Sequence, residues 1–167
     1  MKGHTLRITQ AAAIAALYFI INFLQNLLLP GSTSLAIQFR IAEALCVFAL
    51  FTPAAIPGLG IGCLLFNLMS AGSLPLDFLV GTIATLLSAL FMYRQRQVKL
   101  GKYPLLSLLM PVVFNGLIIG WELTVYLGSP LLLNMLYVAA GEAAVMLVLG
   151  SALYFVSERH AEQLFGR

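Results

Sequence analysis

Four carboxylates stand out in this sequence because they fall in or beside stretches that are otherwise apolar. Glu43, Asp77, Glu122 and Glu142 are accompanied there by one base, Arg40, so four negative charges against one positive charge leave a formal sum of minus three. Ionisable groups are costly at membrane depth and commonly mark a ligand or ion pathway. A cationic or donor-rich ligand would suit this balance of charge.

Uncharged polar residues accompany the carboxylates. They are Asn22, Gln25, Asn26, Gln38, Asn67, Asn115 and Asn134. Asn115 and Glu122 are seven residues apart, which is two helical turns, so they are predicted to share one helix face. Trp121 lies beside that face, where its ring could form the wall of a pocket for a planar heterocycle. The same ring could instead anchor a helix at the membrane interface, and both interpretations stay open.

Three positions have competing interpretations. Glu142 is expected to be the deepest carboxylate; we favour a ligand or coupling role over a protonated carboxyl bonded between helices. Asp77 follows Pro75 at a predicted helix start, where a carboxylate meets the helix dipole favourably, so we favour capping. Arg40 and Glu43 are three residues apart and either form a local ion pair or contact a ligand together, which we favour.

The elements that must position these residues are predicted to be transmembrane helices. Of the 167 residues, 61% are hydrophobic and 9% charged, whereas soluble domains carry about 25% charged residues. The apolar runs approach the ~20 residues that cross a bilayer, where helices satisfy every backbone group internally. We therefore predict one all-α domain over residues 1–167, an integral membrane six-helix bundle with spans at 8–29, 35–51, 54–70, 76–93, 103–126 and 130–156.

The basic residues predict the orientation of the bundle. The second span is the weakest, because only residues 41–51 are uninterrupted and apolar. Six spans place every Lys and Arg except Arg40 on one side, whereas five spans would divide them. By the positive-inside rule we predict that both termini (N-in/C-in) and the loop 94–102 are cytoplasmic.

Small residues in the first span form two overlapping pairs at helical spacing. They are Ala11 with Ala15 and Ala12 with Ala16. Such pairs let a second helix approach closely, either in a partner protein or within the same chain.

Catalysis and metal binding are not expected. The predicted spans contain no histidine, no Gly-x-Ser-x-Gly sequence and no paired acidic metal motif, and Cys46 and Cys63 have no histidine at ligand spacing. The sequence also has no Gly-Lys-Ser/Thr phosphate loop.

Two segments of the chain are distinctive in sequence and read IQFRIAEAL over residues 37–45 and FTPAAIPGL over residues 51–59. Both segments resemble the QueT family. The similarity continues through residues 61–63, Asn67, residues 76–77 and residues 81–85, and more weakly through Asn115, Gly116 and Trp121. It therefore covers most of the chain.

The resemblance implies the substrate-binding S component of an energy-coupling factor (ECF) transporter in a bacterial cell membrane. Such a component captures a queuosine precursor, a deazaguanine such as the aminomethyl form, at its outer face. It associates with a transmembrane coupling subunit and two cytoplasmic ATPases, which would hold the ATP, so this chain itself is expected to bind no cofactor. The resemblance also implies that Ala11, Ala12, Ala15 and Ala16 dock the coupling subunit and that the loop 30–38 gates the site.

The implied substrate matches the charge of the candidate residues. A deazaguanine presents two neighbouring N–H donors, which Glu43 or Glu122 could accept, while Arg40, Gln38 or an asparagine could donate to its ring carbonyl. Its aminomethyl cation could pair with Glu142 or Asp77. The complete candidate set is Gln38, Arg40, Glu43, Asn67, Asp77, Asn115, Trp121, Glu122 and Glu142.

The sequence is also compatible with other functions. A stand-alone secondary carrier would use Glu142 to bind a proton and would work without partner subunits. An S component for another small heterocycle or vitamin, or a purely structural membrane subunit, are further alternatives.

Overall fold

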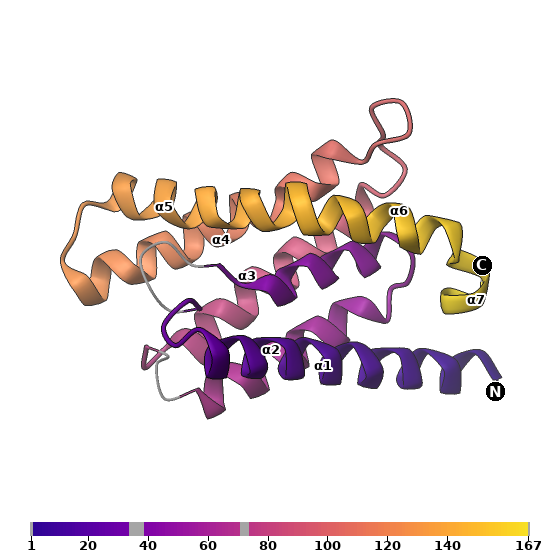
Figure 1. Cartoon of the computed structure of the whole chain (residues 1–167), viewed down its shortest axis with the longest axis horizontal. Helices are drawn as coiled ribbons and strands as arrows, with labels where there is room; N and C mark the ends of the chain where they lie inside the picture. Colours follow the sequence, from indigo (N-terminus) through magenta and orange to yellow (C-terminus); the bar gives the residue numbers. More distant parts are fainter. Residues whose placement is uncertain (1, 34–38, 71–73, 167) are drawn as a thin grey trace.

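The described residues form a bundle of helices that run roughly antiparallel to one another (Figure 1). The computed structural model describes residues 2–33, 39–70 and 74–166. The elements in chain order are α1 (Lys2–Leu28), the 3₁₀ helix η1 (Ile41–Leu50), α2 (Ala55–Met69), α3 (Asp77–Arg94), α4 (Leu105–Leu127), α5 (Leu131–Ala144), the π-helical turn η2 (Val145–Gly150), α6 (Ser151–Arg159) and α7 (Ala161–Phe165). The prediction of an all-α fold is confirmed.

In the residues that the structure describes, four helical stretches are long and apolar enough to cross a membrane. They are Gly3–Leu28, Asp77–Arg94, Leu105–Leu127 and Leu131–Arg159, the last of which joins α5, η2 and α6. The other two apolar helices are shorter, with 10 residues in η1 and 15 in α2. At about 2.0 Å per residue for a 3₁₀ helix and 1.5 Å for an α-helix, each covers only ~20–23 Å of the ~30 Å bilayer core.

The short helix η1 begins at Ile41, later than the predicted span 35–51, because a side chain of α1 binds the backbone in front of it. Gln25 donates to the Phe39 carbonyl, and its Oε1 accepts the Ile41 N–H at 2.9 Å. These groups would otherwise need partners within a longer helix. Arg40, between them, is extended, with φ −92° and ψ 94°.

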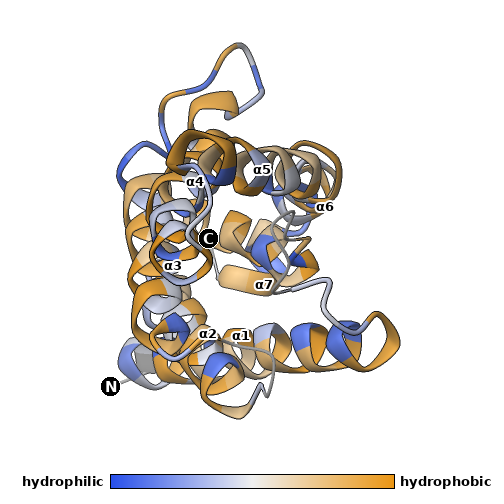
Figure 2. Cartoon of the chain, turned by 90° about the vertical axis from the view of Figure 1, so that its left-hand side faces the viewer, coloured by the Kyte–Doolittle hydropathy of each residue, from blue (hydrophilic) through white to orange (hydrophobic). Residues whose placement is uncertain are grey.

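The centre of the bundle is η1. It contacts α1, α2, α3, α4, η2 and α6, and the end-on view shows the long helices arranged around the middle of the molecule (Figure 2). Its apolar side chains Cys46, Val47 and Leu50 join a core that includes Leu59 and Met92. An element surrounded on all sides can bring polar residues to the interior.

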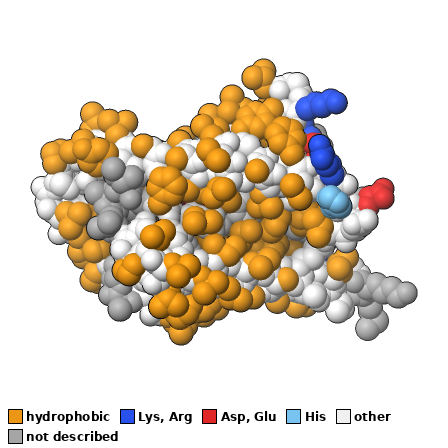
Figure 3. Space-filling view, in the orientation of Figure 1, with side chains coloured by type: hydrophobic (Ala, Val, Ile, Leu, Met, Phe, Trp, Pro, Cys, Tyr) orange, Lys and Arg blue, Asp and Glu red, His pale blue; other side chains and the backbone are white. Residues whose placement is uncertain are grey.

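The outer surface of the bundle is largely apolar. Hydrophobic side chains cover much of the face drawn in Figure 3, while Lys, Arg, Glu and His side chains gather at one end of that face. Figure 1 shows both termini at this same end. An apolar side with charge at one end is the surface expected of a membrane bundle.

Helices α1 and α2 pack with their backbones in close approach. A Cβ on Gly58 would lie 2.7 Å from the Ala11 carbonyl oxygen, and a Cβ on Gly62 would lie 2.8 Å from the Ala15 carbonyl oxygen. The Ala11–Ala15 pair therefore packs within the chain, against glycines four residues apart. Ala12 and Ala16 are exposed.

The C-terminal helix α7 folds back onto η1. Phe165 stacks on Phe51 with ring centroids 5.2 Å apart, and Gln10 of α1 donates to the Leu164 carbonyl at 3.4 Å. The last turn thereby joins η1 to the beginning of α1.

Candidate functional site

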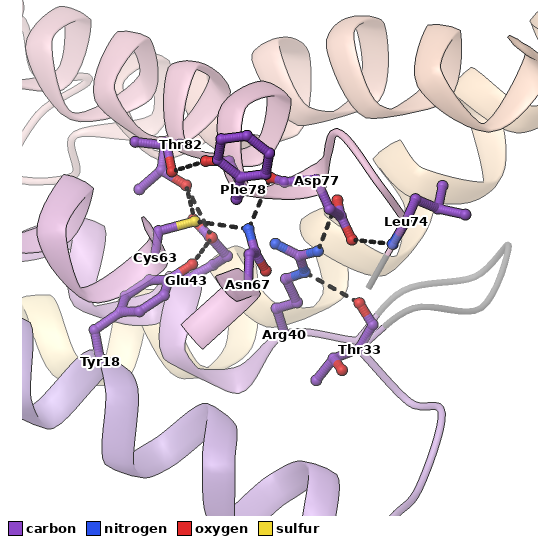
Figure 4. Close-up of polar contacts among 11 residues, drawn as sticks. Tyr18, Thr33, Arg40, Glu43, Cys63, Asn67, Leu74, Asp77, Phe78 and Thr82 are labelled. Atoms are coloured by element: carbon purple, nitrogen blue, oxygen red, sulfur yellow. Dashed lines mark hydrogen bonds and ion pairs between the residues drawn. The ribbon is translucent and has the colours of Figure 1, made fainter. Parts of the chain in front are cut away.

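A buried ion pair joins η1 to α3 at the interior of the bundle. The guanidinium Nη2 of Arg40 lies 3.6 Å from Oδ1 of Asp77, and both side chains are buried. Nε of Arg40 also donates to the Thr33 carbonyl at 3.1 Å. Figure 4 shows the guanidinium between Thr33 and Asp77. In the described residues Arg40 thus pairs with Asp77, and no ion pair links it to Glu43.

The start of α3 is built around the same carboxylate. Asp77 Oδ2 accepts the N–H of Leu74, which lies before the helix, at 3.3 Å. Among the described residues α3 has no side-chain cap hydrogen bond, so the predicted capping bond of Asp77 is not observed, although its carboxylate lies in the first turn of the helix. Asn67 of α2 donates to the Asp77 carbonyl at 2.9 Å. One turn later a Cβ on Gly81 would lie 2.7 Å from Asn67 Nδ2, so a residue without a side chain leaves room for the Asn67 amide.

Glu43 is buried among hydrogen-bond donors. The Tyr18 hydroxyl of α1 donates to Oε1, as does the Thr85 hydroxyl of α3 at 3.3 Å. The Cys46 thiol lies 3.3 Å from Oε2. Both oxygens of Glu43 are therefore engaged by the protein itself.

Glu122 and Glu142 are buried without comparable partners. Within the described part of the chain neither oxygen of Glu122 has a hydrogen-bond partner, and the same holds for Oε2 of Glu142 and Nδ2 of Asn115. Glu122 nevertheless interacts electrostatically with Asp77 and Arg40. The Asp77 carboxyl comes within hydrogen-bonding range of Glu122, but no N–H or hydroxyl group of the described residues donates to the Glu122 oxygens.

Glu142 belongs to the same region of charge. It interacts electrostatically with Glu43 and Arg40, and Asn115 approaches it from α4 without a hydrogen bond of ordinary geometry. The π-helical turn η2 follows three residues later, at Val145. Such turns often lie at functional sites. We call Arg40, Glu43, Asp77, Glu122 and Glu142 the acidic cluster.

The structure brings most of the predicted site residues together. Contacts or electrostatic interactions connect Arg40, Glu43, Asn67, Asp77, Asn115, Glu122 and Glu142. Trp121 is 52% exposed, away from these buried groups, which favours the interfacial-anchor interpretation. Gln38 lies outside the described residues.

Two contacts of the cluster were missed from the sequence. Tyr18 and Thr85 both donate to Glu43. The signal for Tyr18 was its spacing, because Tyr18, Asn22 and Gln25 follow one helix face at intervals of four and three residues. Thr85 carried no comparable signal. The described residues contain no group of three or more His, Cys, Asp or Glu that could hold a metal ion.

A comparison with models of protein families identifies the family of this chain. The model of the QueT transporter family matches residues 8–159. The chain belongs to the QueT transporter family. The resemblance seen in the sequence is thereby confirmed, and this QueT-family chain is a transporter rather than an enzyme. No curated protein and no solved structure matches it.

The buried ion pair makes a prediction about stability. Replacing Arg40 with methionine would leave Asp77 buried without its cation, so we expect Arg40→Met to lower the free energy of unfolding by about 3–5 kcal/mol. Adding Asp77→Asn should recover much of that loss, because it removes the orphaned charge. Unfolding of the purified protein in detergent, analysed as a double-mutant cycle, measures both effects.

A matched control is the exposed ion pair at the other end of the molecule. Lys99 Nζ lies 3.0 Å from Glu158 Oε1, with side chains 35% and 40% exposed. Lys99→Met should cost less than about 1 kcal/mol. An equally small cost for Arg40→Met would show that the Arg40–Asp77 pair does not hold the site together.

Proposed function

We propose that this QueT-family chain is the substrate-capture (S) component of an ECF-type importer and that it binds a queuosine precursor, an aminomethyl deazaguanine, from the outer side of the membrane. The observation that carries the proposal is the acidic cluster, where four buried carboxylates face one arginine. Burying uncompensated charge is costly. A cationic ligand with several N–H donors would offset that cost.

The hydrogen bonds within the cluster suggest a role for each carboxylate. Glu43 is already engaged by Tyr18, Cys46 and Thr85, which favours a structural role. Both oxygens of Glu122 lack partners, which favours this residue as the acceptor for the two neighbouring N–H groups of the ring. Glu142, with one unpartnered oxygen, would bind the aminomethyl cation.

Two further side chains would complete the site. The Arg40 guanidinium has five N–H donors, and its described contacts to Thr33 and Asp77 leave others for a ring carbonyl. Asn115 has an unpartnered Nδ2 near Glu142 that could donate to the ligand. A buried site lined by a few convergent polar groups is typical of small-molecule recognition.

Ligand-induced stabilisation of the purified protein tests the substrate. At a ligand concentration of 100 Kd, binding to the folded state stabilises it by about 2.7 kcal/mol, which corresponds to a rise in Tm of about 5–10 °C. We expect this rise with the aminomethyl deazaguanine and not with guanine, thiamine or riboflavin. Glu122→Gln should weaken binding about 10²-fold, because its amide replaces one acceptor with a donor.

The control variant is Glu158→Gln, whose carboxylate pairs with Lys99 away from the acidic cluster. It should bind the ligand as the unmodified protein does. Stabilisation by a vitamin alone would exclude the deazaguanine as the substrate. Unchanged binding by Glu122→Gln would exclude a ligand-binding role for that carboxylate.

For the topology we propose six membrane crossings with both termini cytoplasmic. Both termini lie at the end of the bundle where charged side chains gather (Figures 1 and 3), which fits the positive-inside rule. In intact cells, an impermeant maleimide should label Leu127→Cys and spare Gln97→Cys until the membrane is permeabilised. The native Cys46 and Cys63 are fully buried and should give little background. The reverse labelling pattern would overturn this orientation.

We further propose that the exposed part of the alanine cluster docks a transmembrane coupling subunit, whose two ATPase partners would bind the ATP. Ala12 lines a groove of about 630 Å³ between α1 and the start of α2, together with Arg7, Ala11, Pro53 and Pro57. A surface of small residues allows close approach of a partner helix. Ala11 and Ala15 also support the groove through their packing against Gly58 and Gly62.

Two leucine substitutions distinguish a role of the alanines in docking a partner from a role in folding. Ala12→Leu fills the exposed groove, so we expect normal ligand binding by the purified protein but loss of most uptake in cells that contain the partner subunits. Ala15 is buried and its backbone lies against Gly62, so Ala15→Leu should instead lower the unfolding temperature. Uptake that proceeds without the coupling subunit would indicate a stand-alone carrier instead.

A further inference from the structure

Asn22, in the middle of α1, has an amide that the folded chain leaves without partners. Its side chain is 0% exposed. Among the residues that the structure describes, neither Nδ2 nor Oδ1 has a hydrogen-bond partner. Most buried polar groups in proteins do have one, so this amide requires an explanation.

The neighbours of Asn22 on the same helix face contact residues 39–43, the segment that contains Arg40 and Glu43 of the acidic cluster. Tyr18, one turn earlier, donates to Glu43, and Gln25, three residues later, binds the backbone of Phe39 and Ile41. Residues three and four apart lie on one face of a helix. The Asn22 side chain therefore lies on the α1 face that holds η1, between the contacts to Glu43 and to Ile41.

Leaving both amide groups unsatisfied destabilises the free protein. An apolar side chain of similar size, such as leucine, would avoid that cost. A ligand that offers an acceptor and a donor side by side would satisfy Nδ2 and Oδ1 at the same time. The unpartnered amide thus predicts that one edge of the ligand carries an acceptor beside a donor. This edge is separate from the edge with two N–H donors that suits Glu122.

We propose that Asn22 is a specificity-determining residue of the ligand site, which donates from Nδ2 to a ligand carbonyl and accepts at Oδ1 from an adjacent N–H group. This inference rests on the proposed function. In an aminomethyl deazaguanine, the ring carbonyl and the neighbouring ammonium group supply this pair. The two ring N–H donors then stay available for Glu122, and Asn22 selects ligands that carry the aminomethyl group.

The test compares Asn22→Leu with the unmodified protein, using thermal unfolding and the Kd for two probes. The ligand-free variant should unfold at the same or a higher temperature, because an unsatisfied amide has been removed. Its Kd for aminomethyl deazaguanine should rise at least about tenfold. Its Kd for deazaguanine without the aminomethyl group should rise by a smaller factor, because that probe loses only the bond from Nδ2 to the ring carbonyl and has no ammonium group for Oδ1 to accept from. The preference between the probes should therefore shrink.

The control is Asn26→Leu, because Asn26 lies one turn further along α1 and lines a groove of about 200 Å³ with Phe19 and Phe23. It should keep both dissociation constants. Asn22→Ala provides the same two binding readouts with a smaller side chain. Unchanged binding and preference in Asn22→Leu or Asn22→Ala, beside normal binding by the unmodified protein, would overturn this inference alone. A ligand-free Asn22→Leu that unfolds at a clearly lower temperature would assign Asn22 a structural role and also overturn it. Failure of the unmodified protein to bind any deazaguanine would overturn the proposed function and this inference together.

Discussion

The burial of one arginine inside an apolar bundle constrains the rest of the site. A guanidinium stays charged in a protein and presents five donors, so it needs acceptors wherever it is buried. Here the Thr33 carbonyl accepts a hydrogen bond from Arg40, and the Asp77 carboxylate forms the ion pair that balances its charge. Asp77 must then lie at the first turn of α3, Asn67 must reach its carbonyl, and Gly81 must leave room for the Asn67 amide. One buried charge thereby determines how four segments of the chain meet.

The polar face of α1 is the second element on which the site depends. Gln25 binds the backbone that precedes η1, and Tyr18 donates to Glu43 within it. Because Gln25 of α1 pairs with the Phe39 carbonyl and the Ile41 N–H, η1 can be short without leaving these backbone groups unpaired. A short helix at the centre of the bundle brings Arg40 and Glu43 into contact range of α1 and α3, which a helix at the edge could not do.

The carboxylates of the acidic cluster differ in what surrounds them. Glu43 and Asp77 receive hydrogen bonds or an ion pair from the protein, whereas Glu122 has neither. An internally satisfied carboxylate stabilises the fold, and an unsatisfied one is available to a ligand. The same contrast separates Gln25, whose amide is fully engaged, from Asn22 on the same helix face. The side chains that are hydrogen-bonded or ion-paired within the protein hold the helices together. The side chains without such partners stay available to bind a ligand.

The sequence by itself determined the helical class, because long apolar runs with few charges leave the backbone no other way to satisfy its polar groups in lipid. It also determined the QueT family and the list of costly polar residues, since each of these is visible in residue type and local spacing. Only the tertiary structure decided which of them are partners. Local spacing suggested Arg40 with Glu43, but packing placed Asp77 of α3 against Arg40, turned Trp121 to the surface and buried Asn22 without a partner. Helix rotation and the length of η1 depend on contacts between segments far apart in the chain, and periodicity within a single segment does not encode them.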